Sequence, residues 1–118
     1  MIYLYVLQLE HNKFYVGRTA NLDKRINDHV LGYGSEWTKR FRVLNLIEYH
    51  ILNDVFDEDK YVKKYMNMYG IDNVRGGTYS TTVLSIDQKK YICAELKTAN
   101  NQCYKCGGID HYVRNCIN

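Results

Sequence analysis

The chain has 118 residues, of which 46% are hydrophobic and 25% are charged, with 8 glycines and no proline. These proportions are typical of a globular protein, and the length allows one compact domain with a short appendage but excludes a multidomain enzyme built around a large cofactor. The formal net charge of +3 is too small to indicate a nucleic-acid partner unless the basic residues gather on one surface.

Targeting and cofactor signals are lacking in the sequence. No stretch reaches the ~20 apolar residues of a membrane-spanning helix, and residues 1–10 lack the basic start and small-residue cleavage site of a secretory signal. We therefore expect an intracellular protein, cytoplasmic or nuclear. Neither a GxGxxG nor a GxxxxGK[ST] loop occurs, so nucleotide-cofactor chemistry is not expected.

The first twenty residues predict a β-hairpin. Residues 2–9 are apolar, aromatic or β-branched on both alternating faces, which is typical of a buried strand. A turn over 10–13 leads into 14–19, which continue the strand pattern. His11 at the turn is expected to be solvated.

The rest of the chain alternates helical and strand patterns. Asn21 is a favourable N-cap, and Ser85 with Gln88 forms a capping-box pattern. The expected elements are a helix over 22–31, a strand over 43–49, a helix over 57–70, a turn over 71–77, a helix over 85–98 and a linker over 98–102.

These elements predict an α+β fold: a small antiparallel β-sheet, opened by the hairpin and flanked by helices. We expect a domain over residues 1–83, a helix and linker over 84–100, and a metal-binding segment over 101–118.

Three of the four cysteines lie near the C-terminus with one histidine between them, in the spacing C-x2-C-x4-H-x4-C: Cys103, Cys106, His111 and Cys116. Four such ligands suit tetrahedral Zn²⁺ and leave no open position for catalysis, so the zinc would be structural. Fourteen residues bury too little apolar surface to fold alone, so metal binding would order them. The alternative is a tail whose cysteines share this spacing by chance.

This segment resembles a CCHC zinc knuckle, through Tyr104 after the first cysteine, Gly107 after the second and Arg114 before the last. Asp110 stands where the knuckle has a glycine. The resemblance implies that Tyr104 and Val113 form a platform for an unpaired base, so that the partner would be nucleic acid of single-stranded or branched character.

Five polar residues fall on positions that face the expected core: Tyr5, Tyr15, Arg25, His29 and Glu58. Arg25 and His29 lie one helical turn apart, and an inward-facing arginine is costly unless an anion accompanies it. The alternative is that the tyrosines are ordinary core and the charged groups reach solvent from the edges of their helices.

The set resembles a GIY-YIG nuclease domain over residues 2 to about 80. The resemblance rests on Tyr3-Leu4-Tyr5, Tyr15-Val16-Gly17, Thr19, Asn21-Leu22, Arg25 and His29 at the intervals of that family, although Tyr3 and Leu4 replace its leading glycine and isoleucine. It implies a metal-dependent endonuclease that hydrolyses phosphodiester bonds in DNA.

Roles follow from the resemblance. Glu58 would hold one Mg²⁺, and helical periodicity favours it over Asp59 or Glu48. Tyr5 would act as base or position the attacking water, with Arg25 and the metal favouring its phenolate. Tyr15 would bind the phosphate, Arg25 would clamp it, and His29 would bond alongside or aid proton transfer.

One loop is basic and aromatic, with Trp37, Lys39, Arg40 and Arg42 close together. This composition suits the rim of a nucleic-acid site, or equally a solvated loop. If Glu58 is not the metal ligand, the same fold would be a catalytically inactive nucleic-acid-binding module. A third interpretation is an adaptor whose knuckle binds protein.

Overall fold

The computed structural model describes residues 1–99, which fall into two units, Met1–Leu84 and the segment from Ser85 onward. The predicted zinc ligands and the predicted base platform of Tyr104 and Val113 lie outside the described residues. In the part of the chain that is described, no helix is long and apolar enough to cross a membrane.

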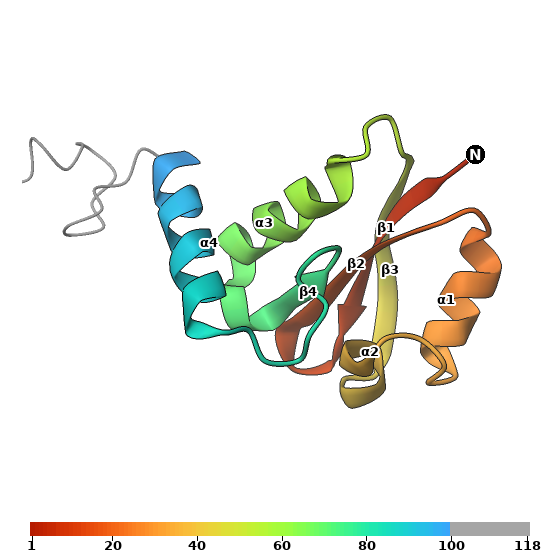
Figure 1. The fold of residues 1–118 in the computed structure, drawn as a ribbon. Helices are drawn as coiled ribbons and strands as arrows, with labels where there is room; N and C mark the ends of the chain where they lie inside the picture. Colours follow the sequence, from red (N-terminus) through yellow and green to blue (C-terminus); the bar gives the residue numbers. More distant parts are fainter. Residues whose placement is uncertain (100–118) are drawn as a thin grey trace, which may run out of the picture. The chain divides into compact units, whose positions relative to one another are not determined.

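The first unit is built on a four-stranded mixed sheet (Figure 1). Its strands are β1 (Tyr3–Leu9), β2 (Lys13–Thr19), β3 (Val43–Ile51) and β4 (Val74–Gly76), in the order β3-β1-β2-β4. The predicted hairpin is present, since β1 and β2 pair antiparallel around a short 3-10 turn, η1 (Glu10–Asn12). His11 and Asn12 adopt left-handed φ angles of 59° and 58° there, as a tight hairpin turn requires.

The prediction of a purely antiparallel sheet was wrong at one edge. β4 pairs parallel with β2, aligning Val74 with Phe14 and Gly76 with Val16, in a stretch that the sequence indicated as a turn. Three residues are too short for a periodic pattern, and the neighbouring glycines are typical of turns. The pairing depends on a distant strand, which local composition cannot reveal.

Helices cover both faces of this sheet (Figure 1). On one face, the cluster of Tyr5, Leu7, Leu9 and Tyr15 packs against α1 (Leu22–Val30) and Trp37 of α2 (Glu36–Arg40). On the other face, Phe14 stacks on Tyr69 of α3 (Asp57–Tyr69) with ring centroids 4.1 Å apart. The aromatic pairs fix both helix layers relative to the hairpin.

The helix α2 was not expected, and it changes the place of Trp37. Its indole is 3% exposed and donates from Nε1 to the Phe14 carbonyl oxygen at 2.9 Å. Trp37 therefore belongs to the core and not to a nucleic-acid rim. Five helical residues give too short a period for sequence analysis, although Ser35 caps the helix by accepting from the Thr38 N–H at 3.2 Å.

Arg75 on β4 is a buried structural residue with 2% exposure. Its guanidinium donates to four backbone carbonyls and lies over the Trp37 ring, 4.7 Å from the centroid. Those carbonyls belong to Ile71 and Val74, on η2 (Ile71–Asn73) and β4, and to Thr81 and Thr82. Arg75 thus ties the loop after β4 to the sheet.

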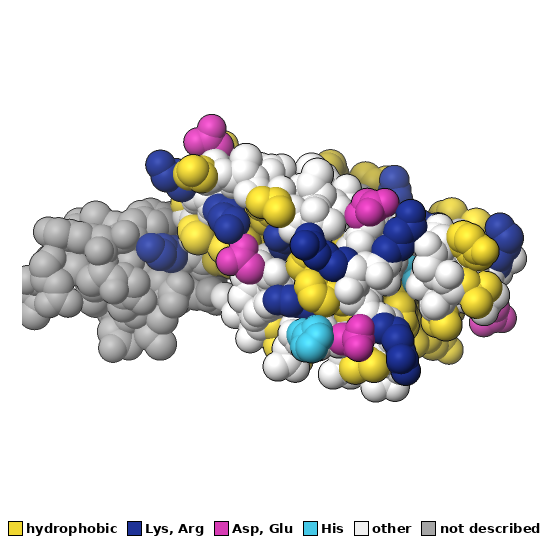
Figure 2. Space-filling view, turned by 90° about the horizontal axis from the view of Figure 1, so that it is seen from below, with side chains coloured by type: hydrophobic (Ala, Val, Ile, Leu, Met, Phe, Trp, Pro, Cys, Tyr) yellow, Lys and Arg dark blue, Asp and Glu magenta, His cyan; other side chains and the backbone are white. Residues whose placement is uncertain are grey.

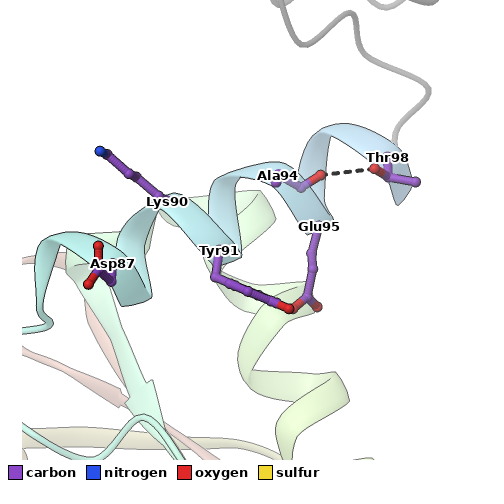
Figure 3. A pocket seen from close by; sticks show the side chains of 6 residues that line it. All are labelled: Asp87, Lys90, Tyr91, Ala94, Glu95 and Thr98. Atoms are coloured by element: carbon purple, nitrogen blue, oxygen red, sulfur yellow. Dashed lines mark hydrogen bonds between the residues drawn. The ribbon is translucent and has the colours of Figure 1, made fainter.

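The second unit contributes one described helix, α4 (Ile86–Ala99). The predicted capping box is present, because Ser85 N–H donates to Gln88 Oε1 at 3.0 Å and Gln88 N–H donates to Ser85 Oγ at 3.1 Å. A shallow hollow follows one side of α4 (Figure 3). Its described lining residues all lie on that helix: Asp87, Lys90, Tyr91, Ala94, Glu95 and Thr98.

Candidate active site

The site begins with Tyr5 in the middle of β1, whose side chain is 1% exposed. Its cross-strand partner is Gly17 on β2, and the phenol ring lies over that glycine. A Cβ atom at position 17 would overlap the Tyr5 hydroxyl. Glycine is therefore needed at position 17 for steric reasons, because it leaves room for the Tyr5 hydroxyl group.

Tyr15 lies on the same face, two residues before Gly17 on β2. The centroids of the two tyrosine rings are 6.4 Å apart, and Tyr15 is 8% exposed. Burial raises the pKa of both phenols, and for Tyr5 the neighbouring Tyr15 raises it further. Both hydroxyls are consequently protonated hydrogen-bonding groups near pH 7 in the protein itself.

His29 joins the tyrosines from α1. Its Nε2 lies 2.7 Å from the Tyr5 hydroxyl, its ring centroid is 4.9 Å from that of Tyr15, and its Nδ1 lies 2.8 Å from Thr38 Oγ1. Burial, together with the charge of Arg25, lowers the pKa of His29 to about 4. The imidazole is therefore neutral at pH 7, with one nitrogen protonated and the other able to accept a proton.

Arg25 lies one helical turn before His29 and is half-buried. It acts on both phenols, lowering the pKa of Tyr5 and Tyr15 through its charge and hydrogen bonds. Arg25 thus favours the Tyr5 phenolate, as expected from its charge, but burial outweighs this effect and the pKa of Tyr5 stays above its ordinary value in the protein alone. A hollow of about 200 Å³ beside Arg25, also lined by Thr19, Asn21 and Lys24, leaves this end of the site open.

Glu58 reaches the site from the first turn of α3. Its carboxylate is 17% exposed and lies 3.6 Å from Arg18 Nε. Burial and the adjacent Asp59 raise its pKa, while Arg18 lowers it. The charge of Glu58 in turn raises the pKa of both Tyr5 and Tyr15.

The two other carboxylates that were considered as metal ligands, Asp59 and Glu48, accept hydrogen bonds from other residues. Asp59 accepts the N–H of Thr78 at 2.8 Å and its hydroxyl at 2.6 Å, which fastens the loop after β4 to α3. Glu48 on β3 accepts bonds from Tyr65 and His50. Of these three carboxylates, Glu58 is the one whose charge raises the pKa of Tyr5 and Tyr15.

Sequence analysis missed several residues around this centre. Arg18 pairs with Glu58. It directly follows the Tyr15-Val16-Gly17 motif, so its place next to the motif was the available signal. Thr38 bonds His29, and Ser35 lowers the pKa of Tyr15 through a side-chain hydrogen bond. Serine is a favourable N-cap residue, which was the available signal for a short helix starting after Ser35.

The predicted rim residues Lys39 and Arg42 are exposed. Lys39 pairs with Glu36 of its own helix at 3.3 Å, and the backbone N–H of Arg42 donates to Glu10 Oε1 at 2.8 Å. Arg40 is also exposed. On the face shown in Figure 2, basic side chains occur at several separate places among acidic and hydrophobic ones.

Two carboxylates act on the centre: Glu58 raises the pKa of the two phenols, and Asp28, which also lines the hollow beside Arg25, raises the pKa of His29. Within residues 1–99 no group of three or more histidine, cysteine, aspartate or glutamate side chains is placed to hold a metal ion. A divalent ion at Glu58 would therefore complete its coordination with water and substrate oxygens, which is the manner in which Mg²⁺ is commonly bound.

The chain belongs to the GIY-YIG family. It matches the GIY-YIG catalytic domain over residues 1–70, more than half of its length. It is also 32% identical over 66 residues to a UPF0213 protein from Syntrophus aciditrophicus (strain SB), covering 52% of this chain and 76% of that protein. No solved structure matches it significantly.

Proposed function

We propose that the chain is a metal-dependent endonuclease that hydrolyses phosphodiester bonds in DNA. One observation carries this proposal: three elements bring Tyr5, Tyr15, Arg25 and His29 together, with the Glu58 carboxylate acting on both phenols. Hydrolysis of a phosphodiester needs a base for water, positive charge at the phosphate and assistance to the leaving oxygen. The site offers a group for each requirement.

Arg25 supplies the positive charge. Its guanidinium is permanently charged and donates parallel N–H bonds that match two oxygens of a phosphate. It lines the open hollow, and its charge and hydrogen bond lower the pKa of Tyr15, so Arg25 acts on both the opening and the phenol. Arg18, half-exposed beside Glu58, adds a second cation at the same edge of the site.

Tyr5 and His29 supply the base. As the water attacks phosphorus, the Tyr5 oxygen accepts the water proton while the phenol proton passes to His29 Nε2, 2.7 Å away. The phenol remains neutral throughout this transfer, so its raised pKa is compatible with the step. The histidine ends protonated and can return a proton to the leaving oxygen through Tyr5.

Glu58 fits the role of metal ligand. Its carboxylate is largely withdrawn from water, and its pairing with Arg18 at 3.6 Å is longer than a tight ion pair. Bound there, Mg²⁺ would supply charge neutralisation at the phosphate oxygens. Asp59 cannot take this role without releasing Thr78.

The experiment is cleavage of supercoiled plasmid and branched DNA with and without Mg²⁺. Nicking that requires Mg²⁺ and is lost in both Arg25→Ala and Glu58→Gln supports the proposal. Glu36→Gln and Lys60→Ala, at exposed positions, are the matched controls and should cut normally. Salt-sensitive binding without cleavage of any substrate would favour the inactive binding module instead.

The proposal extends to the chain beyond the described residues. Cys103, Cys106, His111 and Cys116 would bind one structural Zn²⁺, and Tyr104 with Val113 would hold an unpaired base. One zinc ion per chain in reduced protein, lost in Cys106→Ser, supports this part, and a content well below one excludes it. Oligonucleotide affinity that does not fall with salt would favour the protein-binding adaptor.

A further inference from the structure

Residues 34–38 form a support beneath the Tyr5–His29 pair. Gly34 contacts the imidazole so closely that a Cβ atom there would overlap His29 Nδ1. Trp37 anchors the segment through its bond to the Phe14 carbonyl on β2. Thr38, which is 3% exposed, brings its hydroxyl to His29 Nδ1 at 2.8 Å.

The partners of Thr38 determine which way its hydroxyl hydrogen points. Thr38 Oγ1 lies 3.1 Å from the carbonyl oxygen of Ser35, with geometry suited to donation. A carbonyl oxygen can only accept and a hydroxyl has one hydrogen, so while Thr38 donates to the Ser35 carbonyl it can donate neither to His29 Nδ1 nor to Ser35 Oγ, which lies 3.3 Å away. The lone pairs of Thr38 Oγ1 then face His29, and Nδ1 must be the nitrogen that donates.

A neutral imidazole carries one ring hydrogen. With that hydrogen on Nδ1, the lone pair of Nε2 faces the Tyr5 hydroxyl, which donates to it across 2.7 Å. The bonds therefore run in one direction, from Tyr5 to His29 to Thr38 to the Ser35 carbonyl. In the opposite tautomer Nε2 would donate to Tyr5 and could take no proton from it.

We propose that Thr38 is a positioning residue that holds His29 as the Nδ1–H tautomer, so that Nε2 is free to take the Tyr5 proton. The catalytic consequence rests on the nuclease function proposed above, whereas the tautomer itself does not. Thr38 touches no substrate in this scheme and acts only through His29.

The direct test is long-range ¹H–¹⁵N NMR of the imidazole rings in uniformly ¹⁵N-labelled full-length protein at pH 7. Of the 4 histidines in the chain, the His29 signals are those missing in His29→Gln. We expect the Nδ1–H pattern in the wild type and in Thr38→Ser, which keeps the hydroxyl. Thr38→Val has the same shape without an acceptor, and we expect it to lose that pattern.

The same variants are compared in plasmid nicking with Mg²⁺. Removing a group that orients a catalytic imidazole should lower the rate by roughly 10-fold to 100-fold in Thr38→Val, and Thr38→Ser should recover most of it. Thr98→Val is the matched control, since Thr98 on α4 also donates to a helix carbonyl, that of Ala94 at 3.0 Å. Far-ultraviolet circular dichroism verifies that each variant is folded.

The outcomes separate the two proposals. An Nε2–H pattern for His29 in the wild type overturns the inference, whatever the cleavage assay shows. The Nδ1–H pattern in the wild type, lost in Thr38→Val and kept in Thr38→Ser, supports it even if the protein cuts no DNA, in which case the nuclease proposal alone fails. An unchanged tautomer in Thr38→Val also overturns it.

Discussion

The phenolic oxygen of Tyr5 and Nε2 of His29 lie 2.7 Å apart, although the two residues are 24 positions apart in the chain. Both side chains are 1% exposed. Because burial raises the pKa of the phenol and lowers that of the imidazole, both are neutral near pH 7. The pair can therefore pass a proton without placing a net charge on Tyr5.

Replacing Tyr5 by phenylalanine should abolish this relay and leave the ring in place. We expect the single-turnover rate of DNA cleavage to fall at least ~100-fold, because the base for water is lost. Affinity for DNA, measured with an oligonucleotide in the absence of Mg²⁺, should be unchanged. Tyr3→Phe, on the same strand, is the control, and equal losses in both variants would contradict a specific role for Tyr5.

The pKa of His29 predicts how stability depends on pH. Burial, and then the charge of Arg25, lowers it from 6.5 in the unfolded chain to about 4 in the folded protein. Between these two pKa values the unfolded chain binds more protons than the folded protein. The contribution of His29 to the free energy of unfolding is therefore complete above pH 6.5 and is lost as the pH falls to about 4. The loss from this group reaches up to roughly 3 kcal/mol.

Urea unfolding at a series of pH values measures this loss. The free energy of unfolding of His29→Gln should decline less between pH 6.5 and 4 than that of the wild type, since the titrating group is gone. His11→Gln removes an exposed histidine of the hairpin turn and should keep the wild-type slope. Equal slopes in all three proteins would show that His29 does not titrate as its burial implies.

Periodicity was enough to predict much of this centre. Arg25 and His29 share one helical face, and apolar residues on both faces of 2–9 predicted a buried strand that includes Tyr5. The helix α2 and the strand β4 could not be predicted from periodicity, because they are only five and three residues long. Short elements carry no period, and their stability comes from contacts with distant residues, such as Arg75 on Trp37.

Gly17 provides a test of the close approach of Tyr5. Gly17→Ala would place a methyl group against the phenol hydroxyl and ring, and we expect the free energy of unfolding to fall by about 1–3 kcal/mol. In a Tyr5→Leu background the same substitution should cost less, because the ring is gone. Additive effects of the two substitutions would contradict a direct contact between these residues.

Arg75 should matter for stability and not for DNA binding. Lysine at this position keeps the charge but cannot reach the carbonyls of Ile71, Val74, Thr81 and Thr82 together. We expect Arg75→Lys to lower the free energy of unfolding by about 2 kcal/mol. Its affinity for DNA, measured below the unfolding transition, should match the wild type, and a weakened affinity would instead place Arg75 on the nucleic acid.

Glu58 and Asp59 are neighbours on α3, and their amide variants should have opposite effects. In the folded protein burial raises the pKa of Glu58, so Glu58→Gln removes a desolvated charge and should leave the free energy of unfolding at pH 7 unchanged or higher. Mg²⁺-dependent cleavage should be lost, and Mn²⁺ binding followed by electron paramagnetic resonance should weaken with it. Asp59→Asn disturbs the bonds to Thr78 and should lower stability while the folded protein still binds Mn²⁺. If Asp59→Asn were instead the variant that loses the ion, the metal ligand would be Asp59, and the loop after β4 would have to release Thr78 for the site to form.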